Sequence, residues 1–222
     1  KIQDSFDSAV DSEDDQAFAA FAVIEGSAEN LEQRFTELEM EEPEGGERSA
    51  DSENPEHEDA EDVFSRAEAL MSTMPDLLVR TMVERYLSGN VFLLRGGYSA
   101  GIARKKDIET ALLTPPISSE QILHPEKYWD PDFLDEPASV TIPDLSGELG
   151  EKWRCVGNGV LGELGVAIWT AEEDPDAEFP EWLAGRKSTP ESEGWDGDRY
   201  LCFSDGAGQS LLLWASIWDS ER

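Results

Sequence analysis

Apolar residues recur with a helical period in the first part of the chain. Between about residue 14 and residue 38 they are spaced three, four or seven positions apart, which is typical of one apolar face of an α-helix. Asp14 or Asp15 can cap the start of this helix. The apolar stripe consists of Phe18, Phe21, Ala28, Leu31, Phe35 and Leu38. We therefore expect one long helix over residues 14–38 that buries this stripe.

A second helical block is predicted within residues 63–137. A helix is expected after Pro75, with Gly96 and Gly97 as its C-terminal stop. Its apolar stripe consists of Leu78, Met82, Val83, Leu87, Val91 and Leu94. A further helix is expected over residues 99–113, before two prolines.

Residues 115–128 (PPISSEQILHPEKY) combine several backbone signals in one short stretch. Ser118 and Gln121 have the spacing of a capping box, in which each side chain satisfies a backbone amide at the start of a helical turn. His124 precedes Pro125, which disfavours helix and ends that turn. We expect a capped helical turn at this position.

From about residue 138 the pattern changes to short runs rich in β-forming residues. Strands are predicted at residues 139–142 and 152–156, a helix at 160–170, and a hairpin from residues 201–204 to 209–218. The sequence thus predicts an α+β fold, with a helical N-terminal layer and a small C-terminal antiparallel sheet and helix.

Four regions follow from these patterns. Residues 39–62 are strongly acidic and contain almost no apolar residues, so burial cannot offset the entropy of ordering them, and we expect a disordered linker. It separates a helical segment, 1–38, from a helical region, 63–137. Residues 138–222 form the α+β subdomain.

Acidic residues dominate the composition. Asp and Glu number 50 against 17 Lys and Arg, giving a formal net charge of −33. Such a surface repels nucleic acid and anionic lipid, so neither is an expected partner. The charge fits a disordered acidic segment, and it also fits a halophilic protein, because concentrated salt screens the self-repulsion. No run of about 20 apolar residues is present, so we expect no direct membrane insertion.

Glu25 is the main candidate for chemistry on the first predicted helix, because it falls within the apolar stripe between Phe21 and Ala28. A carboxylate buried there needs a hydrogen bond, a cation or a metal ion. Alternatively, Glu25 lies at the edge of the stripe and reaches solvent. Glu32 projects into a similar sector, so periodicity alone leaves both interpretations open.

Three sequence segments and the first residues of the chain resemble those of a known family. Similar segments occur in the same order in zincin-like metallopeptidases, a family that includes surface proteins of halophilic archaea. In this chain they are residues 22–28 (AVIEGSA), 115–128 and 194–200 (GWDGDRY). Residues 1–7 (KIQDSFD) are similar to the stretch that follows the HExxH motif of that family, with one position deleted. The resemblance covers most of the chain but not residues 39–62.

The resemblance implies a zinc site in which Glu25 joins the two histidines of an HExxH helix and leaves a fourth position for water. No HExxH occurs in these 222 residues, and the second histidine would fall immediately before Lys1. We therefore expect zinc in the full-length protein and none in this chain. Two interpretations are open for His57: it forms an adventitious cation site with its acidic neighbours, or it is part of a solvated linker.

His124 and Tyr128 are candidate catalytic residues by type, since either can donate to the oxyanion of a tetrahedral intermediate. The alternative is that both fix their loop to the core. Asp198 and Arg199 are more typical of an ion pair that fixes a turn than of catalysis. Cys155 and Cys202 fall in predicted strands, where either a disulfide or two free thiols would fit.

The resemblance implies a fragment of a zinc-dependent metallopeptidase-like surface protein, extracellular or at the cell surface, inactive as supplied, with a peptide as the possible substrate. The alternative is a non-catalytic surface or interaction domain on the same scaffold. The sequence leaves the oligomeric state open.

Overall fold

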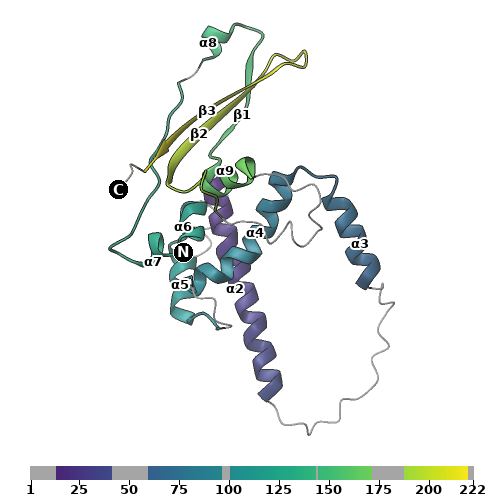
Figure 1. The fold of residues 1–222 in the computed structure, drawn as a ribbon, viewed down its shortest axis with the longest axis vertical. Helices are drawn as coiled ribbons and strands as arrows, with labels where there is room; N and C mark the ends of the chain where they lie inside the picture. The colour runs from purple at the N-terminus through teal and green to yellow at the C-terminus, as the bar shows by residue number, and fades with distance from the viewer. Residues whose placement is uncertain (1–13, 42–59, 97–100, 144, 172–187, 220–222) are drawn as a thin grey trace.

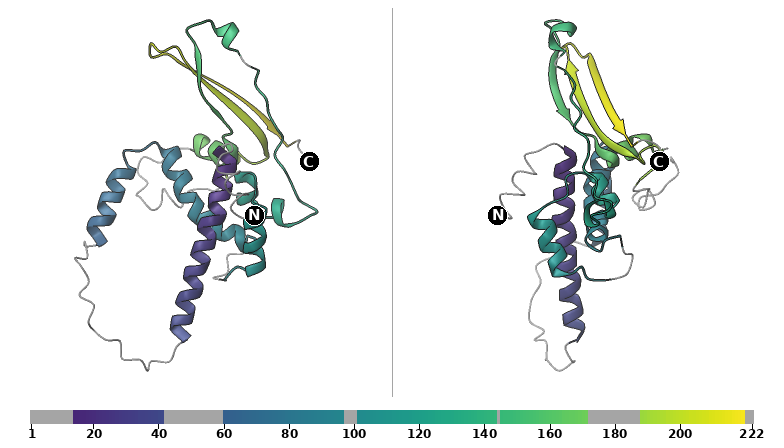
Figure 2. Two further views of the ribbon diagram at one scale, coloured as in Figure 1. Left: turned by 180° about the vertical axis from the view of Figure 1, so that it is seen from behind. Right: turned by 90° about the vertical axis from the view of Figure 1, so that its left-hand side faces the viewer.

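The computed structural model describes residues 14–41, 60–96, 101–143, 145–171 and 188–219. Its fold is α+β, as predicted: a layer of helices carries a three-stranded antiparallel sheet and a short helix at one end (Figure 1). Figure 2 shows that the sheet extends away from the helical layer. None of the described helices is both long and apolar enough to cross a bilayer.

Eight helices and three strands are assigned within the described residues. The helices are α2 (Asp14–Glu41), α3 (Ala60–Met71), α4 (Asp76–Leu93), α5 (Lys105–Leu113), α6 (Ser119–Leu123), α7 (Glu126–Trp129), α8 (Ser146–Leu149) and α9 (Gly162–Thr170). The strands are β1 (Arg154–Gly159), β2 (Trp195–Ser204) and β3 (Ser210–Trp218). The predicted linker, 39–62, lies mostly outside the described residues, although α2 and α3 each extend a few residues into it.

The long helices α2 and α4 cross with their backbones almost in contact. A Cβ atom added at Gly89 would overlap the carbonyl oxygen of Ala22, and one added at Gly26 would overlap the backbone of Gly89. Only glycine at these two positions allows so close an approach. The crossing buries the small-residue face of α2, including Ala19, Ala22 and Val23, which belong to one apolar core with Phe92, Leu93 and Ile122.

This packing overturns the predicted orientation of α2. Leu31, Phe35 and Leu38 of the predicted stripe are 66%, 64% and 63% exposed, whereas Phe18 is buried. The alanines and the glycine of α2 face α4. Small residues let the two backbones approach closely and make many van der Waals contacts, which large side chains would prevent. Half of the stripe predicted on α4 is likewise uncovered, since Leu78, Met82 and Leu87 are exposed, whereas Val83, Val91 and Leu94 are partly buried.

A buried asparagine fixes the chain after α4 to α2. The Asn30 side-chain oxygen accepts a hydrogen bond from the Ala103 amide at 2.6 Å, and its nitrogen donates to Asn90. Arg34 donates to the Ala103 carbonyl at 2.6 Å. Both backbone groups of Ala103 are therefore satisfied although the residue is buried, as buried polar groups require.

The predicted capped turn is confirmed at α6. Ser118 Oγ accepts the Gln121 amide at 3.2 Å, while the Gln121 side chain accepts the amide of Ile117 at 2.9 Å. The glutamine therefore reaches one residue further back than in the standard capping box, in which it would accept the amide of the capping residue itself.

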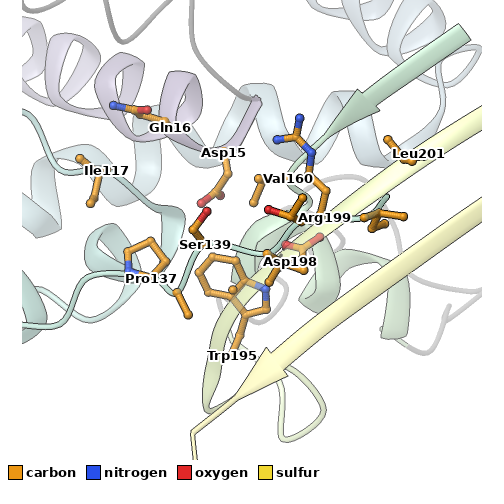
Figure 3. A pocket seen from close by; sticks show the side chains of 15 residues that line it. Asp15, Gln16, Ile117, Pro137, Ser139, Val160, Trp195, Asp198, Arg199 and Leu201 are labelled. Atoms are coloured by element: carbon orange, nitrogen blue, oxygen red, sulfur yellow. Dashed lines mark hydrogen bonds between the residues drawn. The ribbon is translucent and has the colours of Figure 1, made fainter. Parts of the chain in front are cut away.

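The sheet has the order β1-β2-β3, with Asn158 opposite Leu201 and Tyr200 opposite Trp214. The predicted C-terminal hairpin and the helix at 160–170 are confirmed. The strand predicted at residues 139–142 is wrong: this segment is extended but forms no ladder. Figure 3 shows that it lies against β2, where Ala138 donates to the Asp196 carbonyl. Both cysteines are free thiols, with Cys202 opposite Gly157.

The glycine crossing yields a first prediction. Gly89→Ala should destabilise the fold by about 2–4 kcal/mol, because the added methyl overlaps backbone that cannot move aside. Gly147→Ala is the matched control, since nothing lies within 4 Å of its added Cβ. Urea denaturation followed by circular dichroism measures both variants. Equal stabilities for the two would contradict the close crossing.

Candidate functional site

Glu25 lies half-buried on α2, beside Arg85 of α4. The Arg85 guanidinium stacks over Phe21, 4.8 Å from the ring centroid. Burial lowers the pKa of Arg85, and the negative charge of Glu25 partly offsets that effect. Glu25 thus has a cationic neighbour, and no other potential metal ligand of the described residues groups with it.

One group of potential metal ligands does occur in the described part of the chain: Glu120, Asp135 and Asp219. The ammonium group of Lys127 lies among them, 2.5 Å from Glu120, 2.9 Å from Asp135 and 3.5 Å from Asp219. Burial alone would lower the pKa of Lys127, but its hydrogen bonds to Glu120 and Asp135 raise it. The lysine supplies the positive charge that a metal ion would otherwise bring, so we interpret this cluster as structural.

His124 is bound to a buried glutamate of α9. Its Nε2 lies 3.0 Å from Oε1 of Glu163, and Ser188 Oγ donates to the same oxygen at 2.7 Å. The hydrogen bond to Glu163 raises the pKa of His124 above its ordinary value. The other oxygen of Glu163 has no hydrogen-bond partner within the described residues.

Tyr128 lies in the aromatic cluster next to α4. Its ring packs on Phe92 and Trp129, and its hydroxyl donates to the Thr114 carbonyl at 2.5 Å. Burial raises the pKa of Tyr128 to about 12. The two candidate catalytic residues therefore have separate partners: His124 bonds a glutamate of α9, and Tyr128 bonds the end of α5.

Asp198 of β2 joins the sheet to α9. One carboxylate oxygen accepts from the Gly162 amide and the Trp195 indole, at 3.0 and 3.1 Å. The other accepts from the Leu161 amide and the Trp214 indole, at 3.0 and 2.8 Å. Four donors satisfy this buried charge, so Asp198 fixes the turn through N–H groups, while Arg199 donates to Asn158.

A cavity of about 560 Å³ lies between the start of α2, the extended segment 137–142 and β2. Figure 3 shows Asp15 reaching from α2 toward Ser139, with Trp195 and Asp198 on the opposite wall. Asp15 is 5% exposed, accepts the Ser119 amide at 3.0 Å, and has its pKa raised to about 7 by burial. It faces Gly162, where any Cβ would overlap its carboxylate.

Sequence patterns did not indicate a site at Asp15, because an acidic residue at the start of a helix is ordinarily a cap. Its burial depends on α6 and α9, which lie more than 100 residues away along the chain. A glycine at positive φ at the start of α9, Gly162, is the available signal that another group lies close to that backbone.

Comparison with known proteins gives one result. The model of a domain of unknown function, DUF8575, matches residues 153–222. The matched segment spans β1, α9, β2 and β3, so it corresponds to the sheet and its helix. No curated protein and no solved structure matches the chain.

The buried carboxyls predict a pH dependence of stability. Burial raises the pKa of Asp15 from 3.8 to about 7 and that of Glu120 from 4.5 to about 7, so the folded state binds more protons than the unfolded state between these values. The free energy of unfolding should therefore fall as pH rises from 5 to 7.5. The raised pKa of His124 acts in the same direction.

Asp15→Asn, which keeps the shape without a titrating group, should flatten this dependence. Asp132→Asn at an exposed position should not. Urea denaturation at several pH values measures the slope. Stability that increases from pH 5 to 7.5 in the unmodified chain would contradict the assignment.

Proposed function

We propose that this chain is part of a zinc-dependent metallopeptidase-like surface protein in which Glu25 is the carboxylate ligand of the metal, and that the chain alone is inactive. The observation that supports this is the position of Glu25. Glu25 is half-buried on α2 beside Arg85 of α4, and Leu31 and Phe35 further along the same helix are exposed. An apolar face of this length is suited to covering by another helix.

The described residues fit one ligand of a zinc site and not the whole site. A catalytic zinc ion needs about three protein ligands, and Glu25 supplies one. The described part of the chain has a single histidine, His124, and it is hydrogen-bonded to Glu163. In this proposal the two remaining ligands are the histidines of an HExxH helix preceding Lys1, and the bound zinc would activate a water molecule.

Arg85 has a defined role in this proposal. Without metal, the positive charge of the Arg85 guanidinium partly offsets the negative charge of the half-buried Glu25 carboxylate. A zinc ion would take over that role. Possible peptide substrates and an extracellular or cell-surface location belong to the same proposal, and nucleic acid is not proposed as a partner because of the net charge of −33.

A specific observation favours a second candidate, a non-catalytic surface or interaction domain. The polar groups of His124 and Tyr128 both bond groups of the chain itself, as expected of residues that fix a loop. Under this alternative Glu25 is a partly solvated side chain beside Arg85, and the uncovered face of α2 contacts another protein.

Zinc binding separates the two candidates. The full-length protein should bind one zinc ion per chain, measured by inductively coupled plasma mass spectrometry after dialysis, and Glu25→Ala should remove it because one of about three ligands is lost. Glu29→Ala, one turn further along α2, is the control and should retain the metal. Zinc retained by Glu25→Ala would exclude the proposed ligand, and zinc absent from the unmodified protein would favour the interaction domain.

We also propose that the protein is adapted to concentrated salt. At 1 M ionic strength the Debye length is about 3 Å, so the repulsion among the acidic side chains is screened. The melting temperature of this chain should therefore rise steeply from dilute buffer to 2 M KCl. A melting temperature that stays constant over this range would contradict the halophilic interpretation.

A further inference from the structure

The carboxyl group of Asp15 is buried at the wall of the cavity between α2 and β2 without a cation near it. Its hydrogen-bond donors are the amide and the side chain of a single residue, Ser119. The charged groups that act on it are two more carboxylates, Asp198 of β2 and Glu163 of α9. Arg199 lines the same cavity, but its guanidinium donates to Asn158 of β1.

Two features distinguish this position from an ordinary buried carboxyl group. Asp198 nearby has four N–H donors, whereas Asp15 has only the amide and the side chain of Ser119, so Asp15 retains capacity to accept further hydrogen bonds. The cavity it lines has a volume of about 560 Å³, within the range of small-ligand sites.

The remaining walls combine acceptors with an apolar surface. Gln16, Ser139 and Thr141 contribute polar side chains, and Val160 and Trp195 contribute apolar ones. The structure records no hydrogen bond between the backbone of residues 139–142 and any described residue, so its carbonyl groups remain available. A ligand with a positively charged end and an aliphatic stem matches this arrangement, because such a stem packs on apolar walls while its charge reaches an acceptor.

We propose that this cavity binds a primary alkylammonium group, which pairs with the carboxylate of Asp15 while its methylene chain packs against Trp195. The net charge of −33 favours cationic ligands over neutral or anionic ones. The ammonium group can belong to a lysine side chain of an extended peptide, which would also pair with the backbone of residues 139–142, or to a free alkylamine. This site requires neither zinc nor Glu25.

Isothermal titration calorimetry of this chain, with a chelator present and at the lowest KCl concentration at which circular dichroism shows the chain to be folded, tests the proposal. The probes are acetyl-Gly-Lys-Gly-amide, the same peptide with norleucine in place of lysine, and n-butylamine. The lysine peptide should bind at least tenfold more tightly than the norleucine peptide. Equal affinity for the two peptides, or no binding of either the lysine peptide or butylamine, would overturn the proposal.

The two sources of the ammonium group give different results. A lysine peptide that binds at least tenfold more tightly than butylamine supports peptide recognition through residues 139–142. Equal affinity supports a site for the alkylammonium group alone. Because a chelator is present, loss of this binding and loss of zinc binding are separate outcomes.

Asp15→Asn should weaken binding of the lysine peptide at least tenfold, while Asp132→Asn, which removes the same charge at an exposed position, should leave it unchanged. If Asp15→Asn does not fold, as judged by circular dichroism, Ser139→Val tests the same cavity from its exposed edge and should also weaken binding. Unchanged affinity in the folded variants would overturn the assignment.

The affinity should also fall on acidification. A proton on Asp15 removes the charge that pairs with the ligand, and burial raises the pKa of Asp15 to about 7. The charged groups facing it are Asp198, Glu163 and Arg199, and His124 bonds Glu163. Binding of the lysine peptide should be weaker at pH 5.5 than at pH 8, and Asp15→Asn should remove most of this difference. Tighter binding at pH 5.5 would contradict the role of Asp15.

Discussion

The close crossing of α2 and α4 at Gly26 and Gly89 determines how the rest of the molecule is arranged. Because the two backbones nearly touch, the inward face of α2 must consist of small residues, and Ala19, Ala22 and Val23 occupy it. The opposite face, with Leu31, Phe35 and Leu38, is left outward, and Glu25 lies beside Arg85 of α4. The same orientation brings the first turn of α2 against α6 and α9, where Asp15 is buried. Both candidate sites thus follow from one steric constraint.

Carboxylates recur inside this molecule, and each is stabilised differently. Asp198 accepts four N–H donors and joins the sheet to the start of α9. Glu120 is paired with the ammonium group of Lys127, and Glu163 accepts from His124 and Ser188. Asp15 has the least compensation, because its donors come from Ser119 alone and two carboxylates act on it. Since an uncompensated buried charge is costly, this difference marks Asp15 as the position most suited to an external cation.

Local sequence signals predicted the elements of the fold well. The capping residues Ser118 and Gln121, and the turn before β3, depend on chemistry within a few positions, so the sequence was sufficient for them. The orientation of α2 could not be obtained in this way. The stripe of large apolar residues and the face of small residues on α2 have the same helical period. Which of the two is buried depends on Gly89, which belongs to another helix, α4. Residues 139–142 have a β-like composition, but whether an extended segment pairs depends on a free strand edge, which local sequence does not reveal.

Glu25 was identifiable from the sequence, and Asp15 was not. Glu25 interrupts an apolar stripe, which is a local irregularity, and it also falls in a phrase that resembles the zincin-like family. The properties of Asp15 come from desolvation by α6 and α9, which is a tertiary effect. The matched segment 153–222 includes α9 and the sheet but not α2, so similarity in that segment alone does not bear on either carboxylate.

In the proposed function, Glu25 exchanges the charge of Arg85 for that of a zinc ion in the full-length protein. Anomalous diffraction at the zinc absorption edge, from crystals of the full-length protein, tests it most directly. One zinc peak is expected, with a Glu25 carboxylate oxygen about 2.0–2.2 Å away, the usual zinc–carboxylate distance, and with the Arg85 guanidinium displaced from the carboxylate. A zinc peak elsewhere, with Glu25 still beside Arg85, would contradict it.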